Sequence, residues 1–270
     1  MCNHCVIENV KQNMLSRRSL FTGMAIAGAA VVGSGVKTPV LAQQSPGKVV
    51  DLTHAYDGSF PTFDGNPGIE YEWAVEIAKN GYQIHKLTIF EHTGTHIDAP
   101  FHFSADGKSV DQIEPEKLVA PLAIIDITDK AKDDANATVE AADIEAWISA
   151  NGEIPKGAVV ALRSGWSKKV TDPSFRTDGA GKFAFPGFGK SATDLLATLD
   201  VAAIGVDTLS LDPGNSADFA VHNTWLPAGR YGIECLNNLE ELPVKGATIV
   251  VGAPKHKGGT GGPARILALV

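Results

Sequence analysis

The strongest constraint on this chain lies between residues 92 and 102, where side chains suited to metal binding and proton transfer are concentrated. Gly94 and Pro100 disfavour a helix through this segment, and the residues before it have the pattern of a strand. In an extended chain, residues of equal parity share one face. We therefore expect one strand-like segment with local bends to direct four even-numbered side chains toward a common point, namely His92, His96, Asp98 and His102.

The chemistry of these side chains indicates an open metal site. Two imidazoles and one carboxylate, from His92, His96 and Asp98, leave coordination positions for water and substrate. A divalent cation held there lowers the pKa of a coordinated water to about 7. His102 need not bind the metal and is suited to act as a general acid or base, a role that contributes roughly 10²- to 10⁴-fold. The alternative is that these are ordinary polar residues at a sheet edge.

The spacing H-x-G-T-H-x-D-x-P-x-H, complete from His92 to His102, resembles the signature of the cyclase family of metal-dependent hydrolases, whose members include kynurenine formamidases and isatin hydrolases. Weaker similarities follow in order at residues 162–166 and 205–212. The resemblance implies an α/β fold, a mixed-sheet swivelling β/β/α domain, and a homo-oligomer. Hairpins followed by alternating strands and helices are compatible with that fold.

The resemblance also implies a second metal-binding segment, a histidine followed twelve residues later by a glutamate. His222 and Glu234 have this spacing. Asp98 and Glu234 would then bridge to a second ion that His222 completes, with His102 as the proton-transfer residue. The alternatives are a loop or helix-cap histidine and a surface carboxylate. The donor set suits Zn²⁺ or Mn²⁺, with one or two ions per chain.

The N-terminal region has the organisation of an export signal. The pair Arg17-Arg18 precedes an apolar run from residue 24 to residue 35, and small residues end the segment at Ala42. This order is typical of a secretory signal peptide, and the paired arginines resemble the twin-arginine type. We expect residues 1–42 to be a twin-arginine-type signal peptide read by the export machinery, and residues 43–270 to be one periplasmic or secreted domain.

Composition narrows the possible partners. The formal net charge is −8, although the predicted signal carries an excess of basic residues. Such an acidic chain repels nucleic acid, whereas a small-molecule substrate is compatible with it. Cys2 and Cys5 lie in the predicted signal, which leaves Cys235 as the single cysteine of the mature domain and allows no internal disulfide there.

Hydrophobic patterning predicts strands, helices and one hairpin. The hairpin joins strands at residues 70–77 and 83–90 through Gly81. A helix is expected at 138–150 with Thr138 as its cap, and another at 191–199 with Ser191 as its cap. A long loop is expected at 172–189. Further strands are expected at residues 49–54, 122–127, 158–162, 201–206 and 247–251.

Together these features predict an enzyme that cleaves the C–N bond of an aryl formamide or cyclic amide, with N-formylkynurenine-like or isatin-like substrates implied by the resemblance. Phe60, Phe63 and Trp73 lie in or just after an early loop and are candidates for an aromatic substrate pocket. The remaining alternatives are a lactone hydrolase, a polyketide-type cyclase or dehydratase with the same site, and a non-catalytic periplasmic metal-binding protein. Residues 258–263 lack the Lys-Ser/Thr of a P-loop and read as a flexible or active-site loop.

Overall fold

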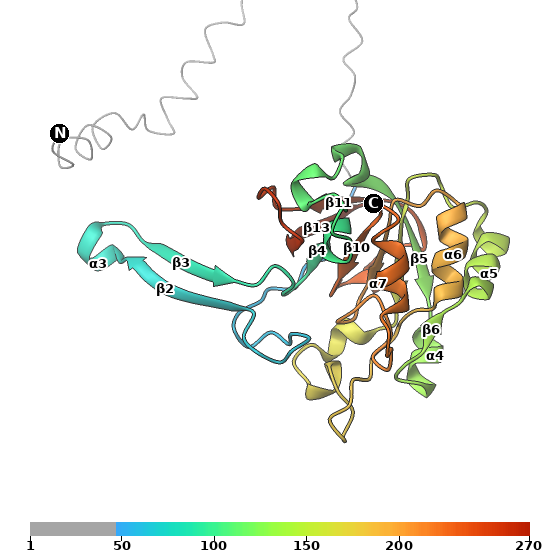
Figure 1. The fold of residues 1–270 in the computed structure, drawn as a ribbon, viewed down its shortest axis with the longest axis horizontal. Coiled ribbons are helices and arrows are strands. Elements are labelled where there is room, and N and C mark those ends of the chain that lie inside the picture. Colours follow the sequence, from blue (N-terminus) through green and yellow to red (C-terminus); the bar gives the residue numbers. More distant parts are fainter. Residues whose placement is uncertain (1–46) are drawn as a thin grey trace, which may run out of the picture. The chain divides into compact units, whose positions relative to one another are not determined.

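The computed structural model describes residues 47–270, which belong to one compact unit (Figure 1). The predicted signal peptide, residues 1–42, lies outside the described residues, as do Cys2 and Cys5. Across 47–270, no helix has both the length and the apolar character that crossing a bilayer requires. The strands are β1 (Val49–Asp51), β2 (Ile69–Val75), β3 (Ile84–Ile89), β4 (His96–Asp98), β5 (Val119–Asp126), β6 (Thr138–Val139), β7 (Val159–Arg163), β8 (Gly187–Phe188), β9 (Ala203–Val206), β10 (Tyr231–Glu234), β11 (Lys245–Gly252), β12 (Gly261–Pro263) and β13 (Arg265–Leu269).

Helices are few and short compared with the strands. Six 3₁₀ turns also occur among the described residues, and the turn at Pro100–His102 concerns the site directly. The α-helices are α3 (Ile77–Asn80), α4 (Thr128–Asp133), α5 (Ala141–Asn151), α6 (Lys190–Thr198) and α7 (Ala220–Trp225).

A nine-stranded mixed sheet organises the unit, in the order β1-β13-β11-β5-β7-β9-β10-β4-β12. The central strands β5, β7, β9 and β10 run parallel, and every other pairing in this sheet is antiparallel. Parallel neighbours require crossover connections, and α5, α6 and α7 lie in these connections and cover one face of the sheet (Figure 1). The sheet therefore combines a parallel α/β centre with antiparallel flanks.

Both faces of the central strands are buried, as a near-continuous apolar sequence predicts. In β5, Leu122 and Ile124 pack into one core cluster, while Ala123 and Ile125 pack into another. The second cluster includes Trp147 of α5 and so lies beneath the helices. The first is enclosed by the curled sheet itself, with residues from β1, β11 and β13 closing it.

The β2–β3 hairpin forms a separate two-stranded arm that extends away from the main sheet (Figure 1). Its register places Tyr71 opposite Leu87 and Trp73 opposite His85. The sequence predicted this hairpin, but its tip contains the short helix α3, which ends at Gly81 in the left-handed conformation. A glycine is favoured there because φ is 78°.

Two predicted helix starts differ from the structure. Thr138 belongs to strand β6, and helix α5 begins three residues later with Glu140 and Asp143 forming a capping box. Helix α6 begins at Lys190 after Gly189, so Ser191 is not its cap. The Ser191 hydroxyl instead accepts a hydrogen bond from the Ala141 backbone N–H at 3.0 Å and so ties the starts of the two helices together.

The α/β mixed-sheet class expected from the sequence is confirmed, and each predicted strand has a counterpart within a few residues. The loop predicted at 172–189 contains one short strand, β8, at its end. Sequence patterning did not identify α4, α7, β10, β12 or β13. The strands β10 and β12 are short and glycine-containing, so they carry little apolar periodicity.

Candidate metal centre

The register between β4 and β10 assembles the centre of the site. The two strands are antiparallel, with His96 opposite Glu234 and Asp98 opposite Gly232. Because side chains alternate along a strand, His96 and Asp98 share one face while Ile97 enters the hydrophobic core on the other. The imidazole and two carboxylates consequently meet at one place, although Glu234 lies more than 130 residues further along the chain.

Two overlapping groups of donor atoms result, and they share Asp98. The first contains His92, His96 and Asp98, and the second contains Asp98, His222 and Glu234; within each group the donor atoms lie within 4.8 Å of one another.

Both carboxylates contact both of the buried imidazoles. His96 Nε2 is 3.4 Å from Asp98 Oδ1 and 3.3 Å from Glu234 Oε2. His222 Nε2 is 3.6 Å from Asp98 Oδ2 and 3.2 Å from Glu234 Oε1. Asp98 and Glu234 thus lie between the two groups, the arrangement that bridging carboxylates require.

Unpartnered atoms show that a divalent cation fits these residues. His96 Nε2 and Asp98 Oδ2 are buried and have no hydrogen-bond partner, a costly state for polar atoms. Imidazole nitrogens and carboxylate oxygens are the donors that Zn²⁺ and Mn²⁺ accept. Burial alone would lower the pKa of His96, but the nearby carboxylates of Asp98 and Glu234 outweigh it and raise that pKa to about 10. The site therefore favours positive charge.

A turn at Gly94 orients His96. Gly94 has a φ of 64°, and its carbonyl oxygen lies 2.9 Å from His96 Nδ1. A carbonyl only accepts, so His96 donates from Nδ1 and directs Nε2 toward the carboxylates. A Cβ at Gly94 would lie 2.8 Å from the Tyr56 ring, so both backbone conformation and space call for glycine here.

Asp212 orients the imidazole of His222 in the same way. The sequence analysis did not assign this role to Asp212. Its Oδ2 lies 2.6 Å from His222 Nδ1, and its carboxylate also accepts from the backbone N–H groups of Val221 and His222. His222 therefore donates from Nδ1 and presents Nε2 to the site, the arrangement typical of carboxylate–histidine–metal contacts. The sequence signal that could have identified Asp212 was the motif at residues 205–212, of which it is the last residue.

His102 lies beside the donor atoms but outside both groups. It ends the 3₁₀ turn at Pro100–His102, and its ring stacks on that of His92 with 3.8 Å between centroids. Burial lowers the pKa of His102 to about 4, so the ring is neutral at pH 7 and able to accept a proton. Only His96–Asp98 is a strand, and the local bends and turns that the expectation allowed for place the other two histidines.

A cavity of about 250 Å³ opens onto the site, and three phenylalanines line it. Phe63 stacks on Phe183 with 4.4 Å between centroids, and Phe103 packs beside His222 at 4.7 Å. Phe219 is the third, and it has a φ of 50° immediately before helix α7. A flat apolar substrate fits such walls.

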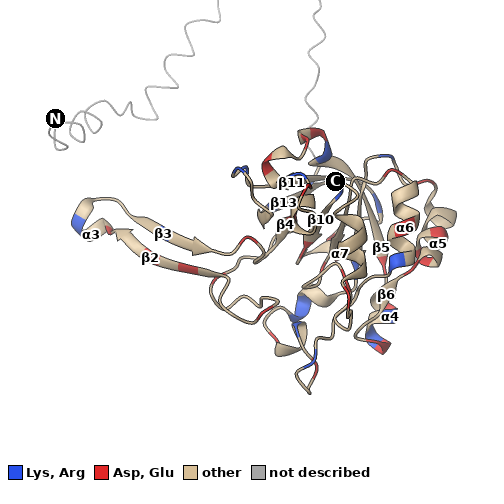
Figure 2. Cartoon of the chain, in the orientation of Figure 1, with Lys and Arg blue, Asp and Glu red and all other residues tan. Residues whose placement is uncertain are grey.

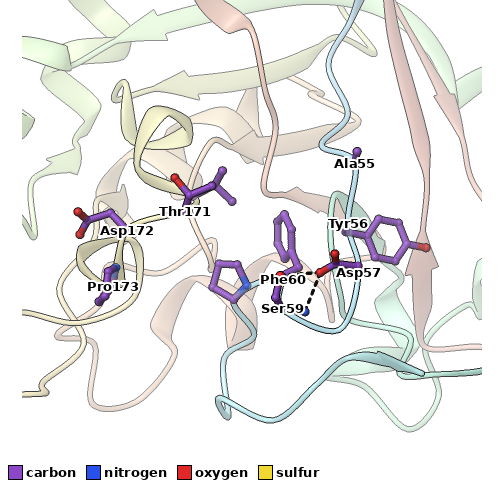
Figure 3. A pocket seen from close by; sticks show the side chains of 10 residues that line it. Ala55, Tyr56, Asp57, Ser59, Phe60, Thr171, Asp172 and Pro173 are labelled. Carbon is purple, nitrogen blue, oxygen red and sulfur yellow. Dashed lines mark hydrogen bonds between the residues drawn. The ribbon is translucent and has the colours of Figure 1, made fainter. Parts of the chain in front are cut away.

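Two of the predicted substrate residues lie elsewhere. Phe60 packs against Phe175 and lines a separate hollow of about 560 Å³ beside Tyr56 and Asp172 (Figure 3). Trp73 is 53% exposed on the arm and its ring lies tilted against that of His85. Of the three aromatic residues proposed from the sequence, Phe63 alone lines the cavity at the metal centre.

The comparisons with known proteins identify the family of this chain. The family model described as "Putative cyclase" matches residues 50–213. The chain belongs to the cyclase family. It is 30% identical to an isatin hydrolase from Roseibium aggregatum, across 87% of this chain and 88% of that protein. A kynurenine formamidase from Bacillus cereus is 27% identical, across 70% of this chain and 81% of the relative. The solved structure of isatin hydrolase A from Ralstonia solanacearum superposes with a TM-score of 0.78 and 33% identity, across 89% of this chain and all of that chain.

Membership in the cyclase family identifies the chain as an enzyme, a metal-dependent hydrolase. The motif from His92 to His102 thus predicted the family correctly. The family match ends at residue 213, so His222 and Glu234 lie beyond it and rest on their geometry in this structure and on the motif spacing. The individual roles of the site residues remain predictions.

Proposed function

We propose that this cyclase-family hydrolase opens a cyclic aryl amide of the isatin type, or cleaves an aryl formamide of the N-formylkynurenine type, by adding water across the C–N bond. The observation that carries the proposal is the buried group of His96, Asp98, His222 and Glu234, with unpartnered donor atoms, at the base of a phenylalanine-lined cavity. The isatin hydrolase similarity extends over more of the chain than the kynurenine formamidase similarity, which favours the cyclic substrate.

Each group of residues in the site would have a role that follows from its position. The donor groups around Asp98 would hold one or two divalent cations, Zn²⁺ or Mn²⁺. A bound cation supplies Lewis acidity, polarising a carbonyl and lowering the pKa of water. Phe63, Phe103 and Phe219 would hold the aryl ring against the cavity wall and exclude bulk water.

Proton transfer falls to His102. Because its pKa is lowered to about 4, the ring is neutral before reaction and accepts a proton from the attacking water. Water adds to the carbonyl carbon, the C–N bond breaks, and the protonated His102 returns the proton to the leaving nitrogen. The products are a carboxylate and an aryl amine, which for a cyclic amide remain in one molecule.

Paired substitutions of His96 and His102 test this division. We expect His96→Ala to lose both bound metal and hydrolysis. His102→Ala should keep its metal but lose roughly 10²- to 10⁴-fold in kcat. Metal content and turnover of isatin, an aryl formamide and a lactone are measured on the same preparations. If His96→Ala keeps its metal and full activity, the assignment is refuted. Turnover of the lactone alone would favour lactone hydrolysis, and full function of His102→Ala would favour a metal-binding protein.

We further infer that the enzyme is a homo-oligomer joined through the β2–β3 arm. One face of the arm carries apolar residues in register, including Tyr71, Trp73 and Leu87, and these side chains are about half exposed. The other face carries polar residues, including the ion pair between Lys86 and Glu72 at 2.6 Å. An isolated two-stranded hairpin is at best marginally stable in water, so the apolar face calls for a covering surface on a second copy.

Export is the remaining part of the proposal. The Arg17-Arg18 pair, the apolar run and the small residues ending at Ala42 support a twin-arginine-type signal. The enzyme would then act in the periplasm or outside the cell. A route that carries folded proteins suits a site built from segments that only the complete fold brings together.

A further inference from the structure

His92 is held differently from the other two histidines of the metal centre. His96 and His222 are each anchored through Nδ1, whereas the Nε2 atom of His92 lies 2.9 Å from the Thr260 hydroxyl. Its Nδ1 atom faces the site and lies 2.7 Å from Asp98 Oδ1. Which His92 nitrogen carries the proton therefore decides whether this residue can bind a cation.

The carboxylate of Glu91 settles the direction of these hydrogen bonds. Glu91 accepts from the Thr260 backbone N–H at 3.1 Å, from the Thr260 hydroxyl and from His256 Nε2. An ionised carboxylate only accepts, and a threonine hydroxyl has a single proton to donate. Because the Thr260 hydroxyl donates to Glu91, its oxygen is left to accept a hydrogen bond from His92 Nε2. The lone pair of His92 consequently lies on Nδ1.

His92 Nδ1 and Asp98 Oδ1 lie 2.7 Å apart, a hydrogen-bonding contact that a cation bound between them would replace. Building on the metal site proposed above, we infer that Glu91 and Thr260 are positioning residues that hold His92 in the tautomer that binds the cation through Nδ1. His96 and His222 would bind through Nε2, so the three imidazoles are not equivalent.

The hydrogen-bonded series from Glu91 through Thr260 to His92, here called the relay, also explains how the glycine-rich segment after β11 contributes to the site. Thr260 immediately precedes β12, which pairs with β4, and its carbonyl oxygen accepts from the Ala99 backbone N–H at 2.8 Å. The Thr260 side chain is thereby fixed relative to the strand that carries His96 and Asp98. Residues 258–263, left open as a flexible or active-site loop by the sequence, supply an orienting group and not a ligand.

The first experiment compares hydroxyl loss with hydroxyl retention at one position. Zn²⁺ affinity is measured by chelator competition for wild type, Thr260→Val and Thr260→Ser. We expect Thr260→Val to bind zinc roughly 10- to 100-fold more weakly, and Thr260→Ser to stay within a few fold of wild type. Thr248→Val, the same change on β11 in a side chain outside the relay, is the matched control and should leave affinity unchanged. Equal affinity for Thr260→Val and wild type would overturn the inference.

A second readout reports the tautomer directly. Long-range ¹H–¹⁵N spectra of the imidazoles in the zinc-loaded protein should show His92 metallated at Nδ1 and protonated at Nε2, with the reverse for His96 and His222. Zinc bound through His92 Nε2 would overturn the inference. Should Thr260→Val fail to fold, Glu91→Gln keeps the shape while removing the charge, and it should weaken zinc binding in the same direction; unchanged affinity there would also overturn it. Wild-type protein that binds no divalent cation would instead defeat the proposed function.

Discussion

At the scale of single residues, the site depends on side chains held by partners that are not themselves ligands. Gly94 turns His96, Asp212 turns His222, and Thr260 with Glu91 turns His92. Gly94, Asp212 and Thr260 each accept a hydrogen bond from one ring nitrogen, which leaves the other nitrogen to face the cation site. Ligand orientation is therefore distributed over several short hydrogen bonds, each to a different kind of acceptor.

Gly94→Ala tests one of these anchors. The left-handed φ costs a non-glycine residue about 1–2 kcal/mol, and the added Cβ would meet the Tyr56 ring at 2.8 Å. We expect the free energy of unfolding to fall by about 2 kcal/mol or more, together with weaker metal binding. Urea denaturation and metal titration are the measurements. Gly157→Ala is the control, because Gly157 has a φ of 71° with nothing near its Cβ position. Unaltered metal affinity in Gly94→Ala would show that the turn does not orient His96.

At the scale of secondary-structure elements, most residues of the metal centre lie on short strands and turns, whereas the longer helices pack against the hydrophobic core. Strand β4 has three residues and β10 has four, yet their pairing brings His96 and Glu234 together. Charged residues lie along the outer helices α4–α6, whereas the strands of the arm carry few (Figure 2). The arm is thus the element whose composition least suits exposure to solvent.

Substitutions on the two faces of the arm test its role in assembly. Trp73→Glu combined with Leu87→Lys places charges on the apolar face, and we expect the assembly to dissociate because buried charge at an interface is unfavourable. Sedimentation velocity measures the mass. Thr88→Glu, on the opposite polar face, should keep the wild-type mass. A monomeric wild-type protein, or a double variant with unchanged mass, would contradict assembly through the arm.

At the scale of the whole molecule, the metal centre exists only in the folded chain. Its residues come from segments near positions 92–102, 212, 222, 234 and 260, which the central sheet brings together. Carboxylates buried in such a cluster repel one another until a cation neutralises them, so metal binding is coupled to folding.

The proposed export signal leads to a prediction at this scale. Replacing Arg17 and Arg18 together by lysine should keep the protein in the cytoplasm, because the paired arginines are the recognition element of the twin-arginine signal type. Cell fractionation with activity assays locates the enzyme. The matched control replaces Lys11, which lies outside the pair, by arginine and should leave export intact. Efficient export of the double lysine variant would contradict a twin-arginine signal.

What the sequence determined by itself was local. Residues 92–102 identify the family because their ligand types and spacing are written in eleven consecutive positions, and the hairpin and buried strands follow from short-range apolar patterns. The pairing of His222 with Glu234 was available as a spacing carried by the resemblance. Those inferences needed no knowledge of distant contacts.

Only the tertiary structure decided which residues surround that motif. The register of β4 against β10 and β12 places Glu234 and Thr260 next to the motif. The helical layer supplies His222, whose Nδ1 atom is hydrogen-bonded to Asp212. The fold also places Phe60 and Trp73 away from the cavity and brings Phe103 and Phe219 into its lining. Chain spacing cannot supply this information, because contacts between strands far apart in sequence depend on how the whole core packs.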